Sequence, residues 1–256
     1  MKVYFIGAGP GAADLITVRG AKALGEASLV LYAGSLVSTD MLKYCRPDAE
    51  IVDTAKLNLE EQEAYYRKAK ENGWVVARLH SGDPAIYGAT AEQMRRLESL
   101  EIPYEIIPGV SSFTSAAAVI NSELTKPEVS QTIILTRTTG RASPMPEKES
   151  LVSLAAHRAT LCIFLSGANF PQVVEDLLTA YPPETPVALV YKASWPQEKI
   201  HRSTLSNMLS EIDVNDWKLS TMLLVGEVLD DAVATESRLY SADYSHKFRK
   251  GAKASC

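Results

Sequence analysis

Short apolar runs alternate with longer amphipathic stretches through the first half of the chain. The apolar runs predict buried strands at 2–6, 29–32, 50–52, 74–79 and 104–107. The amphipathic stretches between them predict helices at 18–24, 38–45, 59–71 and 90–100. Strands and helices that alternate at this spacing form right-handed βαβ units. We therefore expect a parallel sheet that carries helices on both of its faces.

The predicted helix at 59–71 has a sequence signal at each end. Asn58 followed by Glu61 is the pattern of a capping box, in which each side chain accepts a hydrogen bond from the other residue's backbone N–H. Gly73 comes just after the helix, where glycine often adopts the left-handed conformation that ends a helix. Both signals support a helix that starts after Asn58 and stops before Gly73.

The polar stretch 121–130 separates these elements from a second set, so we expect two α/β domains, 1–122 and 123–256. Further strands are expected at 131–136, 161–165, 187–191, 198–205 and 220–226, and helices near 148–157 and 172–178. The strands at 187–191 and 198–205 are joined by a loop too short for a parallel crossover, so they should run antiparallel. The second domain should therefore contain a mixed sheet, followed by a basic tail.

The composition limits the classes of function. The 256 residues are 46% hydrophobic and 22% charged, as in ordinary globular proteins. The formal net charge of −5 argues against a nucleic-acid partner, because binding phosphates needs a cationic face. No apolar run reaches the length of about 18 residues that a membrane span needs. Cys45, Cys162 and Cys256 lack metal-ligand spacing and are typical of a reducing compartment, so we expect a cytoplasmic protein without a metal site.

The glycine-rich stretch GAGPG (7–11) directly follows the first predicted strand. Gly7, Gly9 and Ala12 match the minimal spacing of a dinucleotide-binding loop. Such a loop also needs an acidic residue at the end of the second strand to hold the ribose, and here the chain continues YAGS instead. Pro10 removes a backbone N–H from the turn that would bind phosphate. A dinucleotide is therefore disfavoured, and a purely structural turn remains open at this point.

Two other clusters follow predicted strands in the same way: SGDPAIYG (81–88) and PGVSSF (108–113). Because the carboxyl ends of parallel strands share one edge of a sheet, all three loops should meet there. None of them contains lysine or arginine. A ligand bound by glycine backbone, one carboxylate and serine hydroxyls should be amino-acid-like and short of phosphate. S-adenosylmethionine fits this description.

In this order and spacing, GAGPGAADLIT, SGDPAIYG and PGVSS resemble the tetrapyrrole methylases, which methylate macrocycle carbons with S-adenosylmethionine during cobalamin and sirohaem synthesis. The stretches YAGSLV (32–37), LHSGDPAIYG (79–88), ILTRTTGRASPMP (134–146) and HKFRKG (246–251) resemble the branch that acts on precorrin-4. The resemblance extends over essentially the whole chain. It implies two α/β domains that meet at a cleft holding the cofactor, a homodimer, and a tetrapyrrole substrate.

Matching the family's motifs position by position also implies which residues bind the cofactor. In the first domain these are Pro10, Ser81, Gly82, Asp83, Ile86, Ser111 and Ser112. In the second domain they are Leu165, Ala193, Val225 and Gly226.

The implied reaction is a direct displacement, in which an electron-rich macrocycle carbon attacks the activated methyl group. His80 adjoins the SGDP turn and could remove a proton after methylation, or it could only hold the loop in place. Arg137 and Arg141, in TRTTGRASPMP, are the candidates for binding the substrate carboxylates, the alternative being solvated arginines on a surface loop.

Three functions remain compatible with the sequence. The first is methyl transfer to carbon 11 of precorrin-4 or its cobalt form. The second keeps the family and changes the substrate, to another precorrin carbon or to the protein substrate of the related diphthine synthases. The third is an NAD(P)-dependent oxidoreductase, which the missing acidic residue after the second strand opposes.

Overall fold

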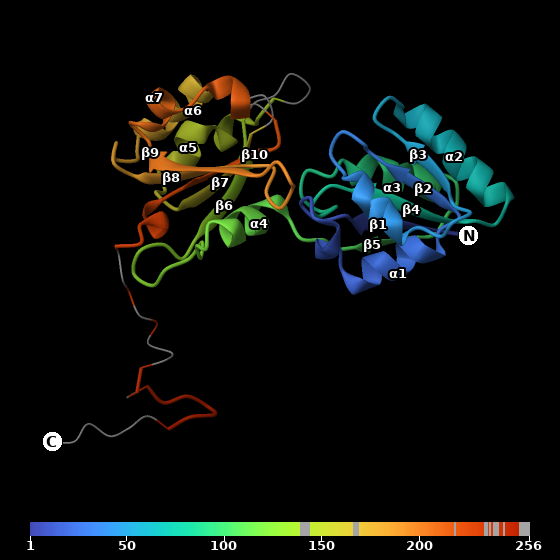
Figure 1. The fold of residues 1–256 in the computed structure, drawn as a ribbon, viewed down its shortest axis with the longest axis horizontal. Coiled ribbons are helices and arrows are strands. Elements are labelled where there is room, and N and C mark those ends of the chain that lie inside the picture. Colours follow the sequence, from blue (N-terminus) through green and yellow to red (C-terminus); the bar gives the residue numbers. More distant parts are fainter. Residues whose placement is uncertain are drawn as a thin grey trace. The chain divides into compact units, whose positions relative to one another are not determined.

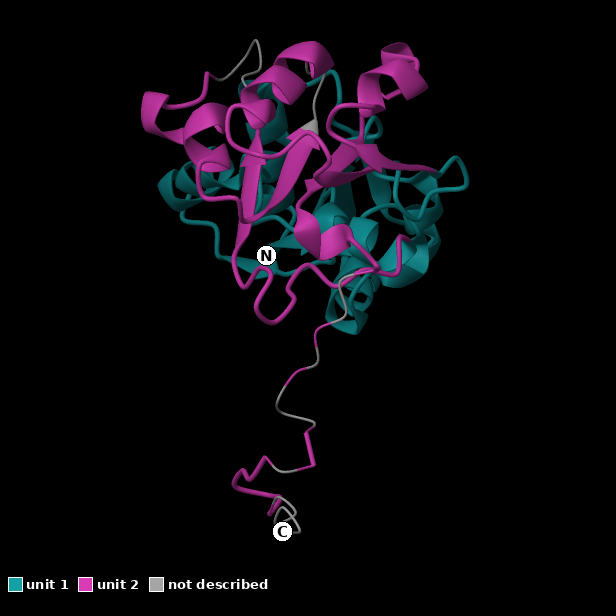
Figure 2. Cartoon of the chain, turned by 90° about the vertical axis from the view of Figure 1, so that its left-hand side faces the viewer, with its two compact units in different colours: residues 1–119, 191–199 teal, residues 120–190, 200–256 magenta. Residues whose placement is uncertain are grey.

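The computed structural model of the chain divides into two compact units (Figure 1; Figure 2). Unit 1 comprises residues 1–119 and 191–199, and unit 2 comprises residues 120–190 and 200–256. The structure describes residues 1–138, 144–165, 169–217, 219–232, 235, 237, 241–242 and 244–250. Segment 191–199, which the sequence analysis assigned to the second domain, groups with unit 1.

Unit 1 contains a five-stranded sheet in the order β3-β2-β4-β1-β5. Its strands are β1 (Lys2–Gly7), β2 (Leu29–Tyr32), β3 (Glu50–Asp53), β4 (Val75–His80) and β5 (Tyr104–Ile107). Each neighbouring pair runs parallel. The expected parallel sheet is confirmed, and β1 lies inside it between β4 and β5.

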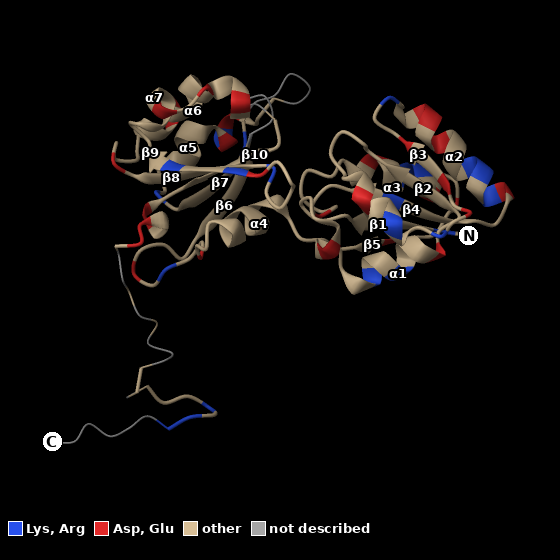
Figure 3. Ribbon diagram, in the orientation of Figure 1, with Lys and Arg blue, Asp and Glu red and all other residues tan. Residues whose placement is uncertain are grey.

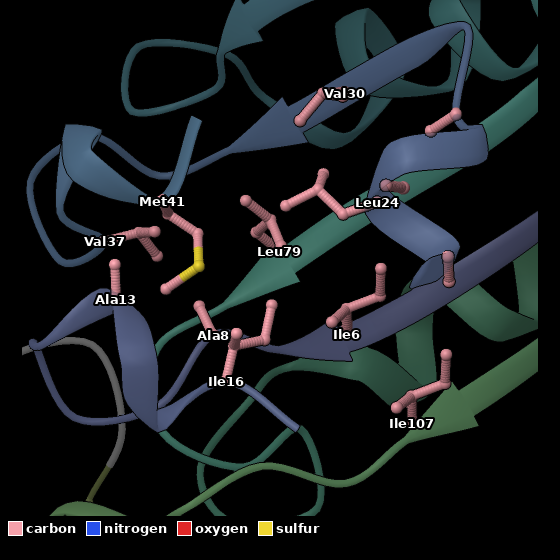
Figure 4. Packing of buried hydrophobic residues seen from close by; sticks show 13 residues of the cluster. Ile6, Ala8, Ala13, Ile16, Leu24, Val30, Val37, Met41, Leu79 and Ile107 are labelled. Atoms are coloured by element: carbon pink, nitrogen blue, oxygen red, sulfur yellow. The ribbon is translucent and has the colours of Figure 1, made fainter. Parts of the chain in front are cut away.

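Helices cover both faces of this sheet, as the alternation predicted. One face packs against α1 (Val18–Glu26) and the 3₁₀ helices η1 (Ala13–Leu15) and η2 (Thr39–Tyr44). The core on this side contains Ile6, Leu24 and Met41 (Figure 4). The other face packs against α2 (Leu59–Glu71) and α3 (Thr90–Ser99). Each large side chain buried in these cores contributes about 1.5–3 kcal/mol to stability.

The segment predicted as a helix at 38–45 is the 3₁₀ helix η2. Ser38 caps its start by accepting a hydrogen bond from the N–H of Asp40. Pro47 follows shortly after its end, and the residue before a proline is disfavoured in the α conformation. An α-helix therefore has little room to extend in this segment.

Helix α2 has the two ends that its sequence predicts. The backbone N–H of Asn58 donates to the carboxylate of Glu61 at 2.8 Å, and the N–H of Glu61 donates to the Asn58 side chain at 2.9 Å. At the other end Gly73 has φ +68°, and the N–H of Trp74 donates to the carbonyl of Ala69. Acidic residues lie in the first turn and basic residues in the last, which suits the helix dipole (Figure 3).

Unit 2 is built around a second sheet, of order β6-β7-β10-β8-β9. Its strands are β6 (Ile133–Arg137), β7 (Thr160–Leu165), β8 (Pro186–Tyr191), β9 (Lys199–Thr204) and β10 (Thr221–Val225). β6 runs parallel to β7, whereas β10 runs antiparallel to β7, so the expected mixed sheet is confirmed. Its helices are α5 (Leu151–Ala155), α6 (Phe170–Leu178), α7 (Met208–Glu211) and the 3₁₀ helices η3 (Glu147–Glu149), η4 (Val214–Trp217) and η5 (Glu227–Leu229).

Within the described residues, no helix is long and apolar enough to cross a membrane. The same residues contain no group of three or more His, Cys, Asp or Glu side chains arranged to hold a metal ion.

Candidate functional site

Three loops leave the same edge of the first sheet. Gly7 at the end of β1 lies opposite His80 at the end of β4. Ile6 lies opposite Ile107, the last residue of β5. The loops that begin at residues 8, 81 and 108 therefore start side by side, as the sequence predicted.

Backbone hydrogen bonds join the first two loops. The N–H of Ala8 donates to the carbonyl of His80 at 2.8 Å. Beyond this point Gly9 and Gly82 form an isolated antiparallel bridge, with N–H to carbonyl distances of 2.8 and 3.2 Å. This bridge lies beyond the parallel pairing of β1 with β4, and it holds the two loops in a defined register.

The carboxylate of Asp83 joins the second loop to the third. Its Oδ1 accepts from the N–H of Ala85 at 2.8 Å, and its Oδ2 accepts from the N–H of Gly109 at 2.9 Å. Glycines allow the close approach of the chains at this point. A Cβ on Gly7 would lie 2.5 Å from the Cα of Gly109, and a Cβ on Gly109 would overlap the carbonyl oxygen of Gly82. A larger side chain would therefore force the loops apart.

The backbone amides of the glycine loop are mostly committed to the protein. The N–H groups of Ala8 and Gly9 donate to the carbonyls of His80 and Gly82, and that of Ala12 donates to the Ser194 hydroxyl. Pro10 has no N–H. Among the described residues, only the N–H of Gly11 within 8–12 lacks a protein acceptor. A pyrophosphate needs several free amides, so this loop is unsuited to a dinucleotide.

The serine pair lies at the start of α4 (Ser112–Val119), directly after the third loop. Ser111 is 6% exposed, and its carbonyl accepts from the N–H of Ser115 and the Thr114 hydroxyl. Neither the Ser111 nor the Ser112 hydroxyl donates to or accepts from another described residue. These hydroxyls do not cap the helix, and both remain available to a ligand.

His80 is buried at the end of β4 and is neutral at pH 7. Burial and, to a smaller extent, the charge of nearby Arg78 lower the pKa of its imidazole to about 3, although a hydrogen bond with the Gly88 backbone acts in the opposite sense. Its ring packs near Phe5, with ring centroids 5.7 Å apart. Its Nε2 is buried and has no partner among the described residues. A ring with this environment is a weak base, and its bond to Gly88 suits it to holding the loop at 81–88.

A buried polar network, which the sequence pattern did not predict, lies beneath α3. Arg78 is 7% exposed, and its Nε–H donates to the Gln93 side chain at 3.1 Å. The Tyr66 hydroxyl donates to the same Gln93 oxygen at 3.2 Å. Gln93 in turn donates to the carbonyl of Ala89, at the end of the second loop. Within the described residues Arg78 has no carboxylate partner, so Gln93 is the main acceptor for its charge.

The remaining first-domain candidates lie in the loop after β4. Ser81 is exposed and Gly82 is buried. Ile86 is half-buried, and its N–H donates to the carbonyl of Asp83 at 3.1 Å. Pro10 is buried in the glycine loop, and its carbonyl accepts from the indole N–H of Trp195 at 2.7 Å.

Ala193 lies in segment 191–199, so the structure groups it with the glycine loop in unit 1. The other candidates from the second half lie in unit 2. Leu165 ends β7 opposite Thr221, and Val225 ends β10 opposite Leu161. Gly226 follows with φ +144°, and its N–H donates to the carbonyl of Pro186.

Arg137 ends β6 and lines a pocket of about 370 Å³ in unit 2. The other charged residues of this lining are Glu147 and Asp176. The pocket is therefore of mixed charge rather than purely cationic. Arg141, the other predicted substrate residue, lies outside the described residues.

Comparisons with known proteins identify the relatives of the chain. The sequence model of a family described as Tetrapyrrole (Corrin/Porphyrin) Methylases matches residues 2–209. Precorrin-4 C(11)-methyltransferase of a Sinorhizobium species is 49% identical over 97% of this chain and 98% of its own length.

Solved structures agree with the sequence comparison. An X-ray structure of a cobalamin biosynthetic enzyme, cobalt precorrin-4 methyltransferase, matches with a TM-score of 0.86 at 45% identity, covering 90% of this chain and 96% of that chain. Uroporphyrin-III C-methyltransferase from Thermus thermophilus, complexed with S-adenosylhomocysteine, matches with a TM-score of 0.76 at 26% identity, covering 92% of this chain and 96% of that chain.

Proposed function

The chain belongs to the tetrapyrrole methylase family, and from that membership we propose that it methylates carbon 11 of precorrin-4 or its cobalt form. S-adenosylmethionine supplies the methyl group, and the products are precorrin-5, or its cobalt form, and S-adenosylhomocysteine. The observation that carries this proposal is the 49% identity to a precorrin-4 C(11)-methyltransferase over 97% of the chain. The expected fold class agrees with this assignment.

The chemistry of the three loops fits S-adenosylmethionine. This molecule has an amino-acid end and a sulfonium charge but no phosphate, and the loops have a carboxylate and free hydroxyls but no lysine or arginine. The amides in the first turn of a helix have no acceptor within the helix, so the start of α4 suits the ligand carboxylate. We assign the ligand ammonium group to Asp83 and the carboxylate to Ser111 and Ser112.

When bound, S-adenosylmethionine supplies a methyl group that is already activated for transfer. The electron pair of the macrocycle carbon forms the new bond to this methyl carbon, and the pair of the breaking carbon–sulfur bond passes to sulfur. The protein's contribution is to hold the reacting groups in line, which can supply about 7–11 kcal/mol of the barrier reduction. Apart from Asp83, the three loops contain no charged side chain, which also suits a reaction in which the sulfonium charge disappears.

The remaining candidate residues keep their predicted roles as proposals. Leu165, Ala193, Val225 and Gly226 would contact the cofactor, and Arg137 and Arg141 would bind substrate carboxylates. For His80 we favour a role in holding the loop, because a ring with a pKa of about 3 is a poor proton acceptor. We also propose a homodimer in the cytoplasm, which light scattering after gel filtration and cell fractionation would test.

Incubation with S-adenosylmethionine labelled in its methyl group tests the function. Precorrin-4, cobalt-precorrin-4 and other precorrins are offered separately, and the labelled carbon is located by NMR. We expect label at carbon 11 of precorrin-4 or its cobalt form. Label on a different precorrin would keep the family and change the substrate. Binding of NAD or NADP without binding of S-adenosylhomocysteine would refute the proposal altogether.

A further inference from the structure

Segment 191–199 holds the glycine loop from outside the first sheet. The indole N–H of Trp195 donates to the carbonyl of Pro10 at 2.7 Å. The hydroxyl of Ser194 accepts from the N–H of Ala12 at 3.0 Å. These two bonds lie on either side of Gly11 in the sequence. Both belong to unit 1, although about 180 residues of chain separate the partners.

Gly11 is a glycine because the indole ring occupies the space of a side chain. A Cβ built on Gly11 would overlap the Cδ1 and Nε1 atoms of Trp195. Gly11 does not have a positive φ, so conformation alone does not require glycine there. The loop and the indole ring are therefore packed directly against each other, backbone against ring.

The segment that carries Trp195 is itself held rigidly. Lys192 and Ser194 have φ values of +48° and +68°, a left-handed conformation that is strained for residues other than glycine. The N–H of Ser194 donates to the carboxylate of Glu198 at 2.6 Å, and that of Trp195 donates to the carbonyl of Lys192 at 2.9 Å. The ammonium group of Lys192 lies 5.3 Å from the centre of the Trp195 ring. Strain that is maintained in this way is typical of functional segments.

We propose that Trp195 and Ser194 are positioning residues for the cofactor, which act by holding the glycine loop in its binding shape. The inference rests on the proposed use of S-adenosylmethionine. With both bonds in place, the loop between Pro10 and Ala12 is ordered before the ligand arrives. The same segment holds Ala193, a predicted cofactor residue, between its two left-handed residues. A loop ordered in advance binds more tightly, because the ligand need not select a minor conformation.

Trp195→Phe and Ser194→Ala test this role in the full-length protein. Phenylalanine keeps an aromatic side chain at position 195 but removes the pyrrole part of the indole together with its N–H donor, and alanine removes the hydroxyl that accepts from Ala12. Each variant should raise the Kd of S-adenosylhomocysteine, measured by calorimetry, about 3- to 10-fold. The KM for S-adenosylmethionine should rise similarly, whereas kcat and the KM for the tetrapyrrole should stay close to those of the wild type. A residue with only a structural role would not raise the KM for S-adenosylmethionine while leaving kcat and the tetrapyrrole KM unchanged.

Trp74→Phe is the matched control. Trp74 also lies beneath a lysine ammonium group, that of Lys68 at 5.3 Å, but it packs in the core on the α2 side of the sheet. This variant should bind S-adenosylhomocysteine as the wild type does. Wild-type affinity in both Trp195→Phe and Ser194→Ala would overturn the positioning role.

The outcomes separate this inference from the proposed function. If the wild type binds S-adenosylhomocysteine and leaves precorrin-4 unmethylated, the substrate assignment fails, and the comparison of variants still decides the role of Trp195. If the wild type does not bind S-adenosylhomocysteine, both the proposed function and the positioning role are refuted.

Discussion

The Oδ2 atom of Asp83 accepts a hydrogen bond from the backbone N–H of Gly109 at 2.9 Å. The other carboxylate oxygen accepts from the N–H of Ala85, inside the turn that Asp83 begins. One side chain therefore shapes its own loop and attaches it to the loop after β5. Each oxygen has a second lone pair, so the carboxylate can still accept a hydrogen bond from the ammonium group of an amino-acid-like ligand.

Replacing Asp83 by asparagine should weaken cofactor binding and reduce stability. Asparagine keeps one oxygen acceptor and turns an NH₂ group towards the other backbone N–H, so one of the two bonds is lost. We expect the free energy of unfolding, from urea titration, to fall by about 1–3 kcal/mol. The Kd of S-adenosylhomocysteine should rise at least about 10-fold in calorimetry.

Asp53→Asn is the control for this prediction. The Oδ1 atom of Asp53 accepts from the N–H groups of Gly34 and Ala55, both at 2.9 Å, so this residue also organises a turn. It lies at the end of β3, which β2 separates from β4, the nearest strand that carries one of the three joined loops. Its replacement should leave the affinity for S-adenosylhomocysteine unchanged. An equal loss of affinity in the two variants would argue against a special role for Asp83.

A methyl group at Gly109 should separate the loops. The added Cβ would overlap the carbonyl oxygen of Gly82, and backbone on both sides leaves it no room to move. We expect Gly109→Ala to lower the free energy of unfolding by about 1–3 kcal/mol and to abolish measurable binding of S-adenosylhomocysteine. Gly25→Ala, in α1, is the control, because a Cβ there would lie 3.4 Å from the Tyr44 carbonyl oxygen, an ordinary contact distance. That variant should gain up to about 1 kcal/mol from helix propensity. Normal binding by Gly109→Ala would contradict the close packing.

The buried imidazole of His80 should make stability depend on pH. Its pKa is about 3 in the folded protein and about 6.5 in the unfolded chain, so only the unfolded chain binds a proton there between these values. Stability should therefore fall as pH decreases from about 6.5 towards 3, by up to about 1.4 kcal/mol per pH unit.

His80→Gln should remove that part of the pH dependence while keeping a donor for the Gly88 backbone. Urea unfolding at pH 4.5 to 7.5 measures the slope, and exposed His157→Gln serves as the control. If His80 only holds the loop, His80→Gln should retain turnover with a raised KM for S-adenosylmethionine. Complete loss of kcat, with the cofactor still bound, would restore the general-base assignment.

Removing Gln93 should expose the cost of a buried guanidinium group. Gln93→Leu leaves both Arg78 and Tyr66 without their shared acceptor, and we expect the free energy of unfolding to fall by about 2–4 kcal/mol. The double variant Arg78→Met, Gln93→Leu removes the charge as well, so it should be more stable than Gln93→Leu alone. Urea unfolding of the two variants makes the comparison. A double variant that is less stable than Gln93→Leu would show that Arg78 is satisfied by other groups.

Arg137 should affect the tetrapyrrole and not the cofactor. Under the proposed function, Arg137→Ala should raise the KM for the tetrapyrrole by about 10-fold, since it removes one charge-assisted contact. The Kd of S-adenosylhomocysteine should not change. Arg67→Ala, at an exposed ion pair on α2, is the control and should change neither constant. An unchanged tetrapyrrole KM in Arg137→Ala would remove this residue from the substrate site.

The sequence predicted the elements that depend on local signals. The ends of α2 followed from Asn58, Glu61 and Gly73, because caps involve residues close together in the chain. The meeting of the three loops followed from parallel strands, whose carboxyl ends share an edge. The partners of these loops were harder to predict, because the pairing of Asp83 with Gly109 depends on the exact position of each turn.

Two features of the site could not be predicted from the sequence, for physical reasons. Trp195 contacts Pro10 across 185 residues, and a strand pattern gives no sign of which unit a connecting loop packs against. Arg78 lies in the apolar run WVVARL. A charged residue within a predicted buried strand indicates that it has a buried polar partner, but it does not indicate which residue that partner is. The partner, Gln93, lies on α3, and the sequence pattern did not specify which side of this helix faces the sheet.

The pairing of Pro10 with Trp195 also has a consequence for synthesis of the chain. At about 5–20 residues per second, the ribosome adds the 185 residues between them in roughly 10 to 40 seconds. During that time β1 and its glycine loop have been made, but the indole that completes the loop has not. A nascent chain released before residue 195 would therefore carry the earliest part of the binding site in an unfinished state. Maturation of this loop is a late event, although its sequence is among the first to be translated.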